Sequence, residues 1–358
     1  SAKKKDIVLM AHATLANNGR MLLGTEVSAF MAVMTAIGTD VVGINCSTGP
    51  VEMEGAVSFL GNNAPCYVSC VPNAGLPFER NGKTVFPMSP EEMAEIMSGF
   101  LKKYRIDVVG GCCGTCPEHI RAMRKVLGTA GKKHVTGRYF SASSYRGFDI
   151  KTMPRPIKVG ERMNTQGSRG MKEMLTRRDY DSIVELGKTQ ERQGADILDL
   201  CVALTERSTE KEDAAILVKR LAQSVEVPVM IDSTDPEVVE RALENYPGTA
   251  FINSINLEDG GKKALRILEL AREHGSFVVC LAIDEKGMAG TVAKGVAAAL
   301  CPAHRQAHGF CHFSLGRGQG GAFVEAHDNV RPKKALNLHA AFGGQHVFRP
   351  VKVGRKAD

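Results

Sequence analysis

The sequence predicts an α/β protein made of two incomplete (β/α)8 TIM-barrel modules in tandem. Strand-like and helix-like segments alternate through residues 1–128 and again through residues 157–288, and this order is typical of a parallel sheet. The strand-like segments are apolar throughout, as in parallel strands that are covered on both faces. No G-x-G-x-x-G follows the first strand of either half, which disfavours a dinucleotide-binding fold. A complete barrel takes about 250 residues, so each half is expected to be only part of one.

The first half, residues 1–128, is expected to contain four βα units. Apolar strands are expected at residues 6–13, 40–46, 66–72 and 107–113. Helices with apolar residues at helical spacing are expected at residues 25–39, 51–63, 89–106 and 117–128. Ser89 and Glu92 form a capping-box pattern at the start of the third helix, and Pro117 suits the first turn of the fourth.

Residues 129–156 lack any period and contain many Gly, Ser and Pro residues, so they are expected to form a linker. The second half, residues 157–288, is expected to contain five strands, at residues 157–162, 195–201, 227–232, 250–255 and 276–284. Four helices are expected between them, at residues 171–194, 213–226, 236–246 and 261–275. The first of these is predicted as one long helix.

Residues 289–358 differ in composition from the rest of the chain. They carry ten Lys and Arg residues against three Asp and Glu residues, which accounts for the whole net charge of +7. We interpret them as an atypical basic tail, out of frame or disordered. A nucleic-acid partner is not expected, because the tail lacks interleaved aromatic residues and a binding motif. The spacing from Cys301 to His312 resembles a metal knuckle, but the change of composition argues against a metal site there.

The overall sequence argues against a membrane protein and against a secreted protein. No apolar run approaches the roughly 20 residues that a membrane span needs, so no membrane partner is expected. The ten cysteines stand in a long chain in which we recognise no secretory signal. This usage indicates a reducing, cytoplasmic compartment in which thiols serve metal binding or catalysis.

Three cysteines end two of the predicted strands in the first half. Cys46 ends the strand at 40–46, and Cys112 and Cys113 end the strand at 107–113. In (β/α)8 barrels the chemistry sits at these carboxyl ends. Three thiolates suit Zn²⁺ with a fourth position open, and a substrate thiol bound there would be alkylated at sulfur. The alternative is that free cysteines are buried small apolar residues, which we favour for Cys66 and Cys70.

The motifs around these cysteines resemble a known family. "GINCSTGP", "GGCCGTCPEHI" and "GRMLLGTEVSAF" are similar to the homocysteine S-methyltransferase domain of cobalamin-dependent methionine synthases. The resemblance implies that residues 1–128 are the C-terminal half of the homocysteine barrel and that Cys46, Cys112 and Cys113 bind zinc. Cys116 stands where the family more often has Thr, and we interpret it as a bystander near the site.

The second half resembles the pterin-binding domain of the same family. The similar motifs are "IKVGERMNTQGSRGMKEML", "MIDSTDPEVVERAL" and "AFINSINLEDG", so residues 157–288 would be the N-terminal part of the methyltetrahydrofolate barrel. Asp232 and Asn253 lie at predicted strand ends, where a carboxylate and an amide match the donor and acceptor edge of a pterin ring. The alternative for Asp232 is a helix N-cap just before Pro236.

The resemblance also extends the expected folate site. It implies that Asp232 and Asn253 bind the pterin, that Glu161, Arg162, Asn164 and Asp199 lie near it, and that Asp232 is the catalytic organiser that assists protonation of the pterin. Cys201 stands where the family usually has Asn, which weakens one expected contact.

The function implied is methyl transfer from 5-methyltetrahydrofolate, through cobalamin held on a separate module or corrinoid protein, to zinc-activated homocysteine. The products are methionine and tetrahydrofolate. One alternative is a truncated, non-catalytic fragment with residual zinc or pterin binding. Another is a methyltetrahydrofolate:corrinoid protein methyltransferase, against which the three cysteines argue because that reaction needs no zinc-bound thiol.

Overall fold

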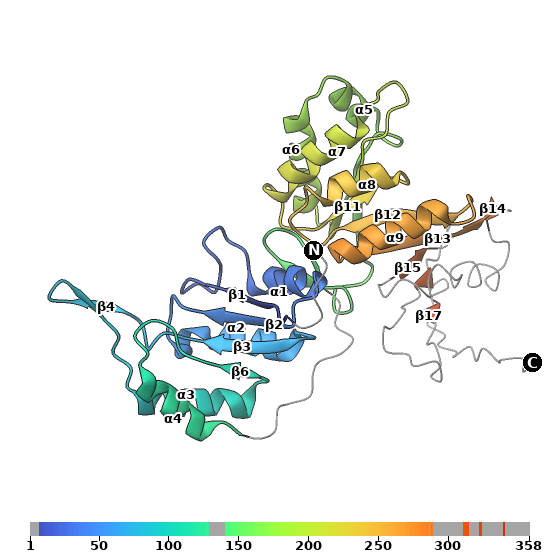
Figure 1. Cartoon of the computed structure of the whole chain (residues 1–358). Coiled ribbons are helices and arrows are strands. Elements are labelled where there is room, and N and C mark those ends of the chain that lie inside the picture. The colour runs from blue at the N-terminus through green and yellow to red at the C-terminus, as the bar shows by residue number, and fades with distance from the viewer. Residues whose placement is uncertain are drawn as a thin grey trace, which may run out of the picture. The chain divides into compact units, whose positions relative to one another are not determined.

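The computed structural model describes residues 7–128, 140–285 and 287–288, together with three short strands near the C-terminus (Figure 1). The chain divides into two compact units, residues 1–153 and residues 154–358. The tail at 289–358 that the sequence sets apart lies outside the described residues, except for those strands. They are β15 (Cys311–Ser314), β16 (Ala322–Phe323) and β17 (His339–Ala340).

Unit 1 is built on a four-stranded parallel sheet. Its order is β1 (Met10–Ala13), β2 (Val41–Asn45), β3 (Tyr67–Val71) and β6 (Val108–Val109). The helices between the strands are α1 (Val27–Ala36), α2 (Pro50–Asn63), α3 (Pro90–Lys103) and α4 (Pro117–Val126). Side chains such as Ile44, Val68 and Met97 are fully buried between sheet and helices. The four βα units that the sequence predicts are therefore present, and Ser89 and Glu92 form the expected capping box.

Two hairpins of unit 1 are not among the predicted elements. The first joins β4 (Phe78–Arg80) to β5 (Lys83–Val85). Its turn residues Asn81 and Gly82 both have positive φ, which is the Asn-Gly signature of a two-residue hairpin. The second hairpin joins β7 (Phe140–Ala142) to β8 (Gly147–Asp149), within the segment expected as a linker.

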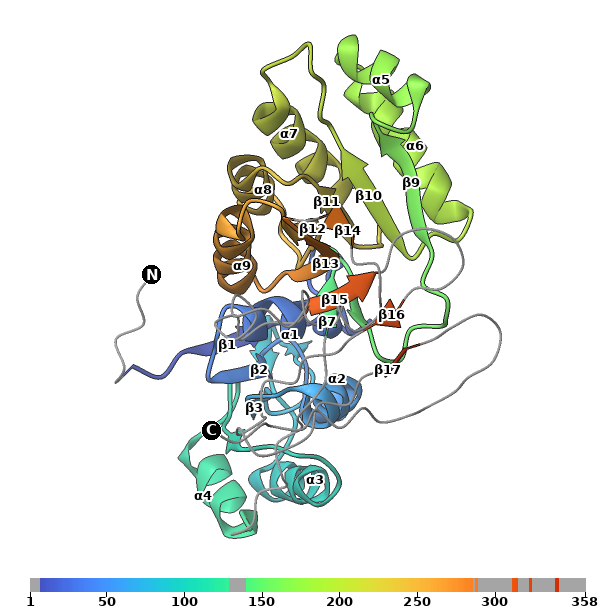
Figure 2. The ribbon, with the colours of Figure 1, turned by 90° about the vertical axis from the view of Figure 1, so that its right-hand side faces the viewer.

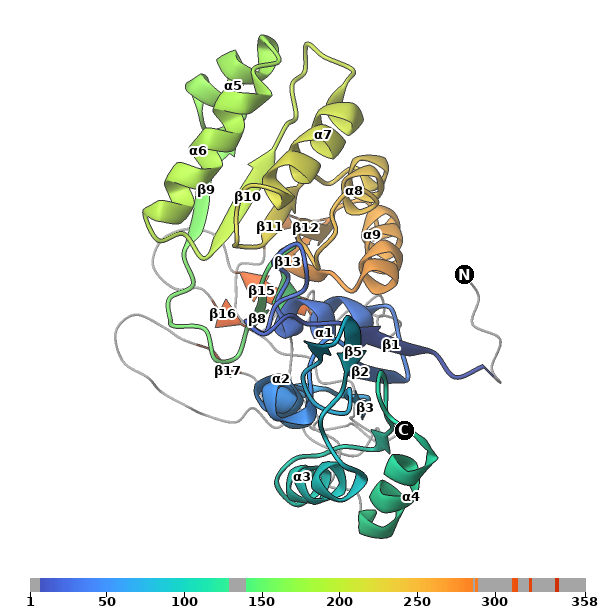
Figure 3. The ribbon, with the colours of Figure 1, turned by 90° about the vertical axis from the view of Figure 1, so that its left-hand side faces the viewer.

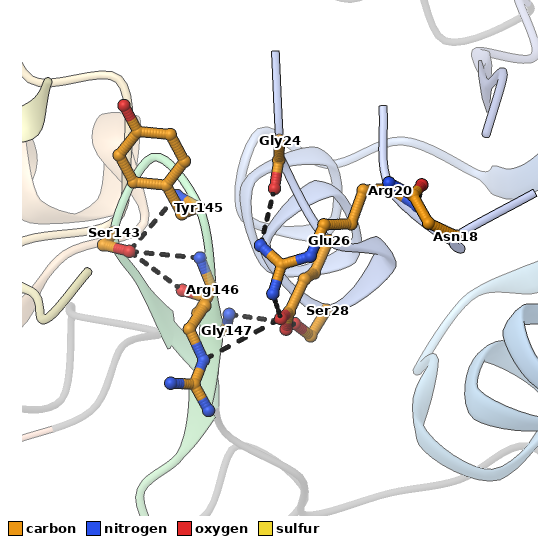
Figure 4. A network of polar contacts seen from close by, with 9 residues as sticks. All are labelled: Asn18, Arg20, Gly24, Glu26, Ser28, Ser143, Tyr145, Arg146 and Gly147. Carbon is orange, nitrogen blue, oxygen red and sulfur yellow. Dashed lines mark hydrogen bonds and ion pairs between the residues drawn. The ribbon is translucent and has the colours of Figure 1, made fainter. Parts of the chain in front are cut away.

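The β7–β8 hairpin is held against the start of α1 by a polar network (Figure 4). The Glu26 carboxylate pairs with Arg20 at 2.6 Å and with Arg146 at 3.9 Å. Ser28 Oγ accepts a hydrogen bond of 2.9 Å from the backbone N–H of Gly147, and Tyr145 O accepts one of 2.8 Å from the backbone N–H of Glu26. These contacts make residues 140–149 part of unit 1.

Unit 2 contains five parallel strands that neighbour one another in chain order. They are β9 (Val159–Asn164), β10 (Ile197–Cys201), β11 (Val229–Asp232), β12 (Phe251–Leu257) and β13 (Phe277–Asp284). β14 (Gly287–Met288) adds antiparallel to β13, β15 pairs parallel with β13, and β16 and β17 pair with each other.

Five helices cover the strands of unit 2 (Figures 2 and 3). They are α5 (Arg169–Thr176), α6 (Tyr180–Arg192), α7 (Glu210–Ala222), α8 (Pro236–Leu243) and α9 (Lys262–His274). Apolar side chains including Leu198, Leu217 and Val239 are fully buried in this core.

The single long helix predicted for residues 171–194 is wrong. Arg178 has a positive φ of 56°, a conformation that a helix does not tolerate. Asp179 then caps a new helix, because its carboxylate accepts a hydrogen bond from the backbone N–H of Ser182. Apolar residues recur at helical spacing on each side of this break, and no glycine or proline marks it, which is why the sequence pattern predicts one continuous helix.

The described residues confirm a mixed α/β fold with parallel sheets, and neither sheet closes into a barrel within them. None of the described helices combines the length and the hydropathy that crossing a bilayer requires.

We predict that Gly147→Ala releases the β7–β8 hairpin from α1. A Cβ at residue 147 would lie 2.5 Å from the backbone oxygen of Ser28, and backbone atoms give way less readily than a flexible side chain. Hydrogen exchange of the amides at residues 140–149 is expected to accelerate. Gly99→Ala is the control, since a Cβ there meets nothing within 4 Å. Unchanged exchange in Gly147→Ala would contradict the role of the network.

Candidate functional site

The three cysteines predicted to bind metal lie together at the carboxyl edge of the unit 1 sheet. Cys46 follows β2, and Cys112 and Cys113 follow β6. The Sγ atom of Cys113 is 3.6 Å from that of Cys46 and 3.9 Å from that of Cys112. All three Sγ atoms lie within 4.8 Å of one another, so one ion would reach all of them.

The last residue of β3 and the two residues after it hold both cysteine loops in place. The backbone N–H of Cys46 donates to Val71 O at 3.1 Å, and that of Cys112 donates to Pro72 O at 2.8 Å. Asn73, which is 2 % exposed, accepts a hydrogen bond of 3.1 Å from the backbone N–H of Cys113 through Oδ1. Partners of this kind orient metal ligands.

The sequence reasoning missed Asn73. The available signal was its position directly after the strand that separates the two cysteine-bearing strands.

The backbone of the cysteine loops adopts unusual conformations. Cys46 and Ser47 have φ of 62° and 65°, and a non-glycine residue in this region costs about 1–3 kcal/mol. Gly114 has φ of 78°, and a Cβ there would lie 2.2 Å from the ring of Phe86. Strain of this kind persists where the surrounding structure enforces it and marks candidate functional loops.

The thiols influence one another's protonation. Hydrogen bonds with Cys46 and Cys112 raise the pKa of Cys113 to about 11, because a second thiolate beside the first is disfavoured. A hydrogen bond from the Ser47 backbone lowers the pKa of Cys46. Cys46 therefore loses its proton more readily than Cys113. A bound cation would remove the mutual repulsion and favour three thiolates.

The other cysteines of unit 1 differ from these three. Cys70 is fully buried, and burial raises its pKa to about 12. Burial also raises the pKa of Cys66, so both behave as apolar core groups. The exposed Cys116 directs its Sγ to His119 Nδ1 at 3.1 Å and lies outside the three-sulfur group.

A cavity of about 670 Å³ in unit 1 is formed mainly by the loop after β1 and by α2, with Arg20, Glu26 and Glu52 in its wall. The three cysteines do not line it. We therefore place the candidate metal chemistry at the sulfur group and not in the cavity.

In unit 2, polar side chains form one row across the ends of four neighbouring strands. In the strand register Asn164 of β9 pairs with Cys201 of β10, and Asp232 of β11 pairs with Asn253 of β12. Leu200 pairs with Ile231, so Cys201 and Asp232 are the next residues along these two strands. Asp199 lies two residues before Cys201 and therefore on the same face of the sheet.

Hydrogen bonds from the amides of Asn164 and Asn253 join this row to Asp199. Asn164 Nδ2 donates to Asp232 Oδ2 at 2.8 Å and to Asp199 Oδ2 at 3.3 Å. Asn253 Nδ2 donates to Asp199 Oδ1 at 3.3 Å. The predicted residues Asn164, Asp199, Asp232 and Asn253 therefore form one cluster, which we call the polar row.

The two carboxyl groups of the polar row hold protons more tightly than usual. Burial, and then the charge of Asp232, raise the pKa of Asp199 to about 7. Burial also raises the pKa of Asp232, against the hydrogen bond from Asn164 and the neighbouring Cys201 thiol, which lower it. At neutral pH the row therefore holds both a proton donor and acceptors, which suits a heterocycle with a donor and acceptor edge.

The other two residues predicted for the folate site, Glu161 and Arg162, are not members of the polar row. Glu161 lies near enough for its charge to raise the pKa of both aspartates. Arg162 is not brought to the row, because its guanidinium donates to the Gln193 side chain at the C-terminal end of α6. The N-cap alternative for Asp232 is wrong, because Asp235 caps α8 through a hydrogen bond from the backbone N–H of Glu237.

Known proteins match both parts of the chain. Residues 1–127 match the family model of homocysteine S-methyltransferase, and residues 160–310 match that of pterin binding enzyme. The methionine synthase of Mycobacterium leprae (strain TN) is 38% identical over 302 residues, which are 82% of this chain and 25% of that protein. The methionine synthase of Mycobacterium tuberculosis (strain ATCC 25618 / H37Rv) is 37% identical over 297 residues, with the same coverage.

These matches confirm the resemblance recognised in the sequence. The chain spans about a quarter of the length of the curated relatives it matches. Among solved structures, dihydropteroate synthase of Burkholderia cenocepacia aligns with a TM-score of 0.32 and 17% identity, over 52% of this chain and 64% of that chain.

We predict that Asp199→Asn changes how the stability of unit 2 depends on pH. With a folded pKa of about 7, Asp199 keeps its proton in the folded state while the unfolded chain releases it above its ordinary pKa. Its contribution to the free energy of unfolding therefore falls as pH rises toward 7 and is constant above. Relative to the parent, the variant is expected to gain about 2 kcal/mol between roughly pH 5 and pH 8.

Guanidinium denaturation at both pH values measures this difference. Asp181→Asn on α6, whose side chain is 94% exposed, is the matched control and is expected to show a constant difference from the parent. A constant difference in Asp199→Asn would contradict the raised pKa.

Proposed function

We propose that this chain carries two active sites of a cobalamin-dependent methionine synthase. The reaction transfers a methyl group from 5-methyltetrahydrofolate to homocysteine and yields tetrahydrofolate and methionine. The observation that carries the proposal is the group of three Sγ atoms within 4.8 Å, in a segment that matches the homocysteine S-methyltransferase model. The polar row, in a segment that matches the pterin-binding model, supports the folate half of the reaction.

The cysteine group fits a zinc ion. Tetrahedral zinc with Zn–S bonds of about 2.3 Å separates its sulfurs by about 3.8 Å, and the Sγ atom of Cys113 lies 3.6 Å from that of Cys46 and 3.9 Å from that of Cys112. Cys46, Cys112 and Cys113 would hold the ion and leave the fourth position for the homocysteine sulfur. Bound zinc would act as a Lewis acid and lower the pKa of that thiol toward neutral pH. Val71, Pro72 and Asn73 would keep the ligands in position.

The polar row would bind the pterin ring of methyltetrahydrofolate. Asp232 would accept hydrogen bonds from ring N–H groups, while Asn164 and Asn253 would supply amide donors and acceptors. Asp199, protonated up to about pH 7, would orient these partners. Across the whole reaction the bond from the methyl carbon to N5 breaks and a bond to sulfur forms. The proton that homocysteine loses balances the one that N5 gains, and Asp232 would organise the site where N5 is protonated.

Cobalamin would carry the methyl group between the two sites while bound to a partner module or corrinoid protein. The chain spans about a quarter of the length of its relatives. We propose that this quarter activates both substrates, homocysteine and 5-methyltetrahydrofolate.

We also infer that each sheet is part of a (β/α)8 barrel. Strands that neighbour one another in chain order, joined by helices, are typical of that fold. β1 ends the strand order of its sheet among the described residues, and Met10 at its start and Val8 two residues before it are 50% and 66% exposed, as expected where a further part of a barrel would pack.

We predict that the purified chain holds about one zinc ion and that Cys113→Ser loses it during dialysis against a chelator. The serine hydroxyl is a much weaker zinc ligand than a thiolate. Elemental analysis measures the zinc content of each protein. Cys116→Ser is the matched control, because its sulfur lies outside the group, and it is expected to keep the metal. A parent chain without zinc, or equal loss in both variants, would contradict the assignment of the ligands.

We predict that Asp232→Asn weakens binding of 5-methyltetrahydrofolate by about tenfold or more. The variant loses a charged acceptor, and such a hydrogen bond is worth about 1.5–3 kcal/mol. Isothermal titration calorimetry measures the affinity. Asp235→Asn is the control three residues away, because Asn is an equally good helix N-cap, and it is expected to bind as the parent does. Equal affinity in all three proteins would refute the role of Asp232.

A further inference from the structure

Cys201 occupies a central place in the proposed pterin site. It ends β10, between Asn164 on β9 and Asp232 on β11. In-register residues of neighbouring parallel strands point to the same face of the sheet. The thiol therefore faces the same way as the amide and the carboxylate on either side of it. Cys201 is only 4% exposed, so protein atoms enclose its thiol.

The contacts of Cys201 leave its proton available to Asp232. The hydroxyl of Thr165 is 3.8 Å from Cys201 Sγ but only 2.7 Å from Ala203 O, so the carbonyl takes the hydroxyl proton. The backbone N–H of Thr165 also donates to Cys201 O at 3.2 Å, which ties the two residues together. Cys201 and Asp232 lie side by side on the neighbouring strands β10 and β11, one residue beyond the Leu200–Ile231 pair, which places the thiol beside the carboxylate.

We propose that Cys201 is a positioning residue of the pterin site, whose thiol donates to the Asp232 carboxylate and, together with Asn164, orients it toward the ring. This inference rests on the proposed function for the identity of the ligand. It gives Cys201 a role in the site, although no contact from this thiol is expected from the sequence. Burial, followed by the nearby carboxylates of Asp232 and Asp199, raises the pKa of Cys201, so the thiol remains a donor at neutral pH.

Four acidic groups are close enough to influence this contact. Asp199 lies on the same strand, Asp232 on β11 and Glu161 on β9. The charge of Asp232 raises the pKa of Asp199, and the charge of Glu161 raises the pKa of both aspartates. The Glu210 carboxyl on α7 is influenced by the charge of Asp232. A donor that favours the charged form of Asp232 offsets this crowding of negative charge.

The test follows the titration of Asp232 in the ligand-free chain. Carboxyl carbon NMR of protein labelled with ¹³C-aspartate gives the midpoint for Asp232 in the parent, Cys201→Ala, Cys201→Val and Cys201→Ser. Loss of the donor in the Ala and Val variants is expected to move the midpoint up by about half a pH unit or more. The Ser variant retains a donor and is expected to stay near the parent. Val replaces the thiol at similar volume if Ala leaves too large a cavity.

Cys280→Ala provides the matched control, because Cys280 is another buried cysteine of the unit 2 sheet, on β13. It is expected to leave the Asp232 midpoint unchanged. The same midpoint in the parent and in both the Ala and Val variants would overturn the proposal.

A second measurement separates this inference from the proposed function. Isothermal titration with 5-methyltetrahydrofolate is expected to show weaker binding by several-fold in the Ala and Val variants but not in the Ser variant. A midpoint that moves without any change in affinity would overturn the positioning role. If neither the parent nor any variant binds the folate, the proposed function fails, while the NMR titration still decides whether the thiol donates to Asp232.

Discussion

The hydrogen-bonded register between neighbouring parallel strands brings the candidate functional side chains together. Residues far apart in the chain, such as Cys46 and Cys113, meet because β2, β3 and β6 run in the same direction and end at the same edge. The same constraint aligns Asn164, Cys201, Asp232 and Asn253 across β9 to β12. A shift of one residue in either ladder would turn these side chains to the opposite face. The helix packing and the buried cores maintain this register.

Each of the two candidate sites brings groups of the same kind close together. Three thiols share one small volume after β2 and β6, and the pKa of Cys113 rises to about 11 as a result. Two buried carboxyl groups share the polar row, where amide donors from β9 and β12 partly offset the repulsion. Such arrangements cost stability when nothing is bound. A cation at the thiols, or a heterocycle with N–H groups at the carboxylates, would relieve that cost.

Local sequence signals predicted most elements but failed at particular points. The break between α5 and α6 depends on Arg178 adopting a positive φ, which arginine does not signal in a sequence. The β4–β5 hairpin did carry a signal, the Asn81-Gly82 pair, but its strands have only three residues each. The β7–β8 hairpin depends on Glu26 and Ser28, more than 100 residues earlier, and no local pattern contains that information.

The sequence by itself determined the α/β class, the order of the βα units and which thiols, amides and carboxylates stand at the strand ends. Apolar periodicity, capping residues and the thiols and carboxylates at strand ends are local properties of the chain. Only the tertiary structure decided that Arg162 contacts α6 instead of the polar row, that Asp235 and not Asp232 caps α8, and that Asn73 supports Cys113. These outcomes depend on which side chains meet across strands and helices, and such distances are set by packing and register, which residue types alone do not specify.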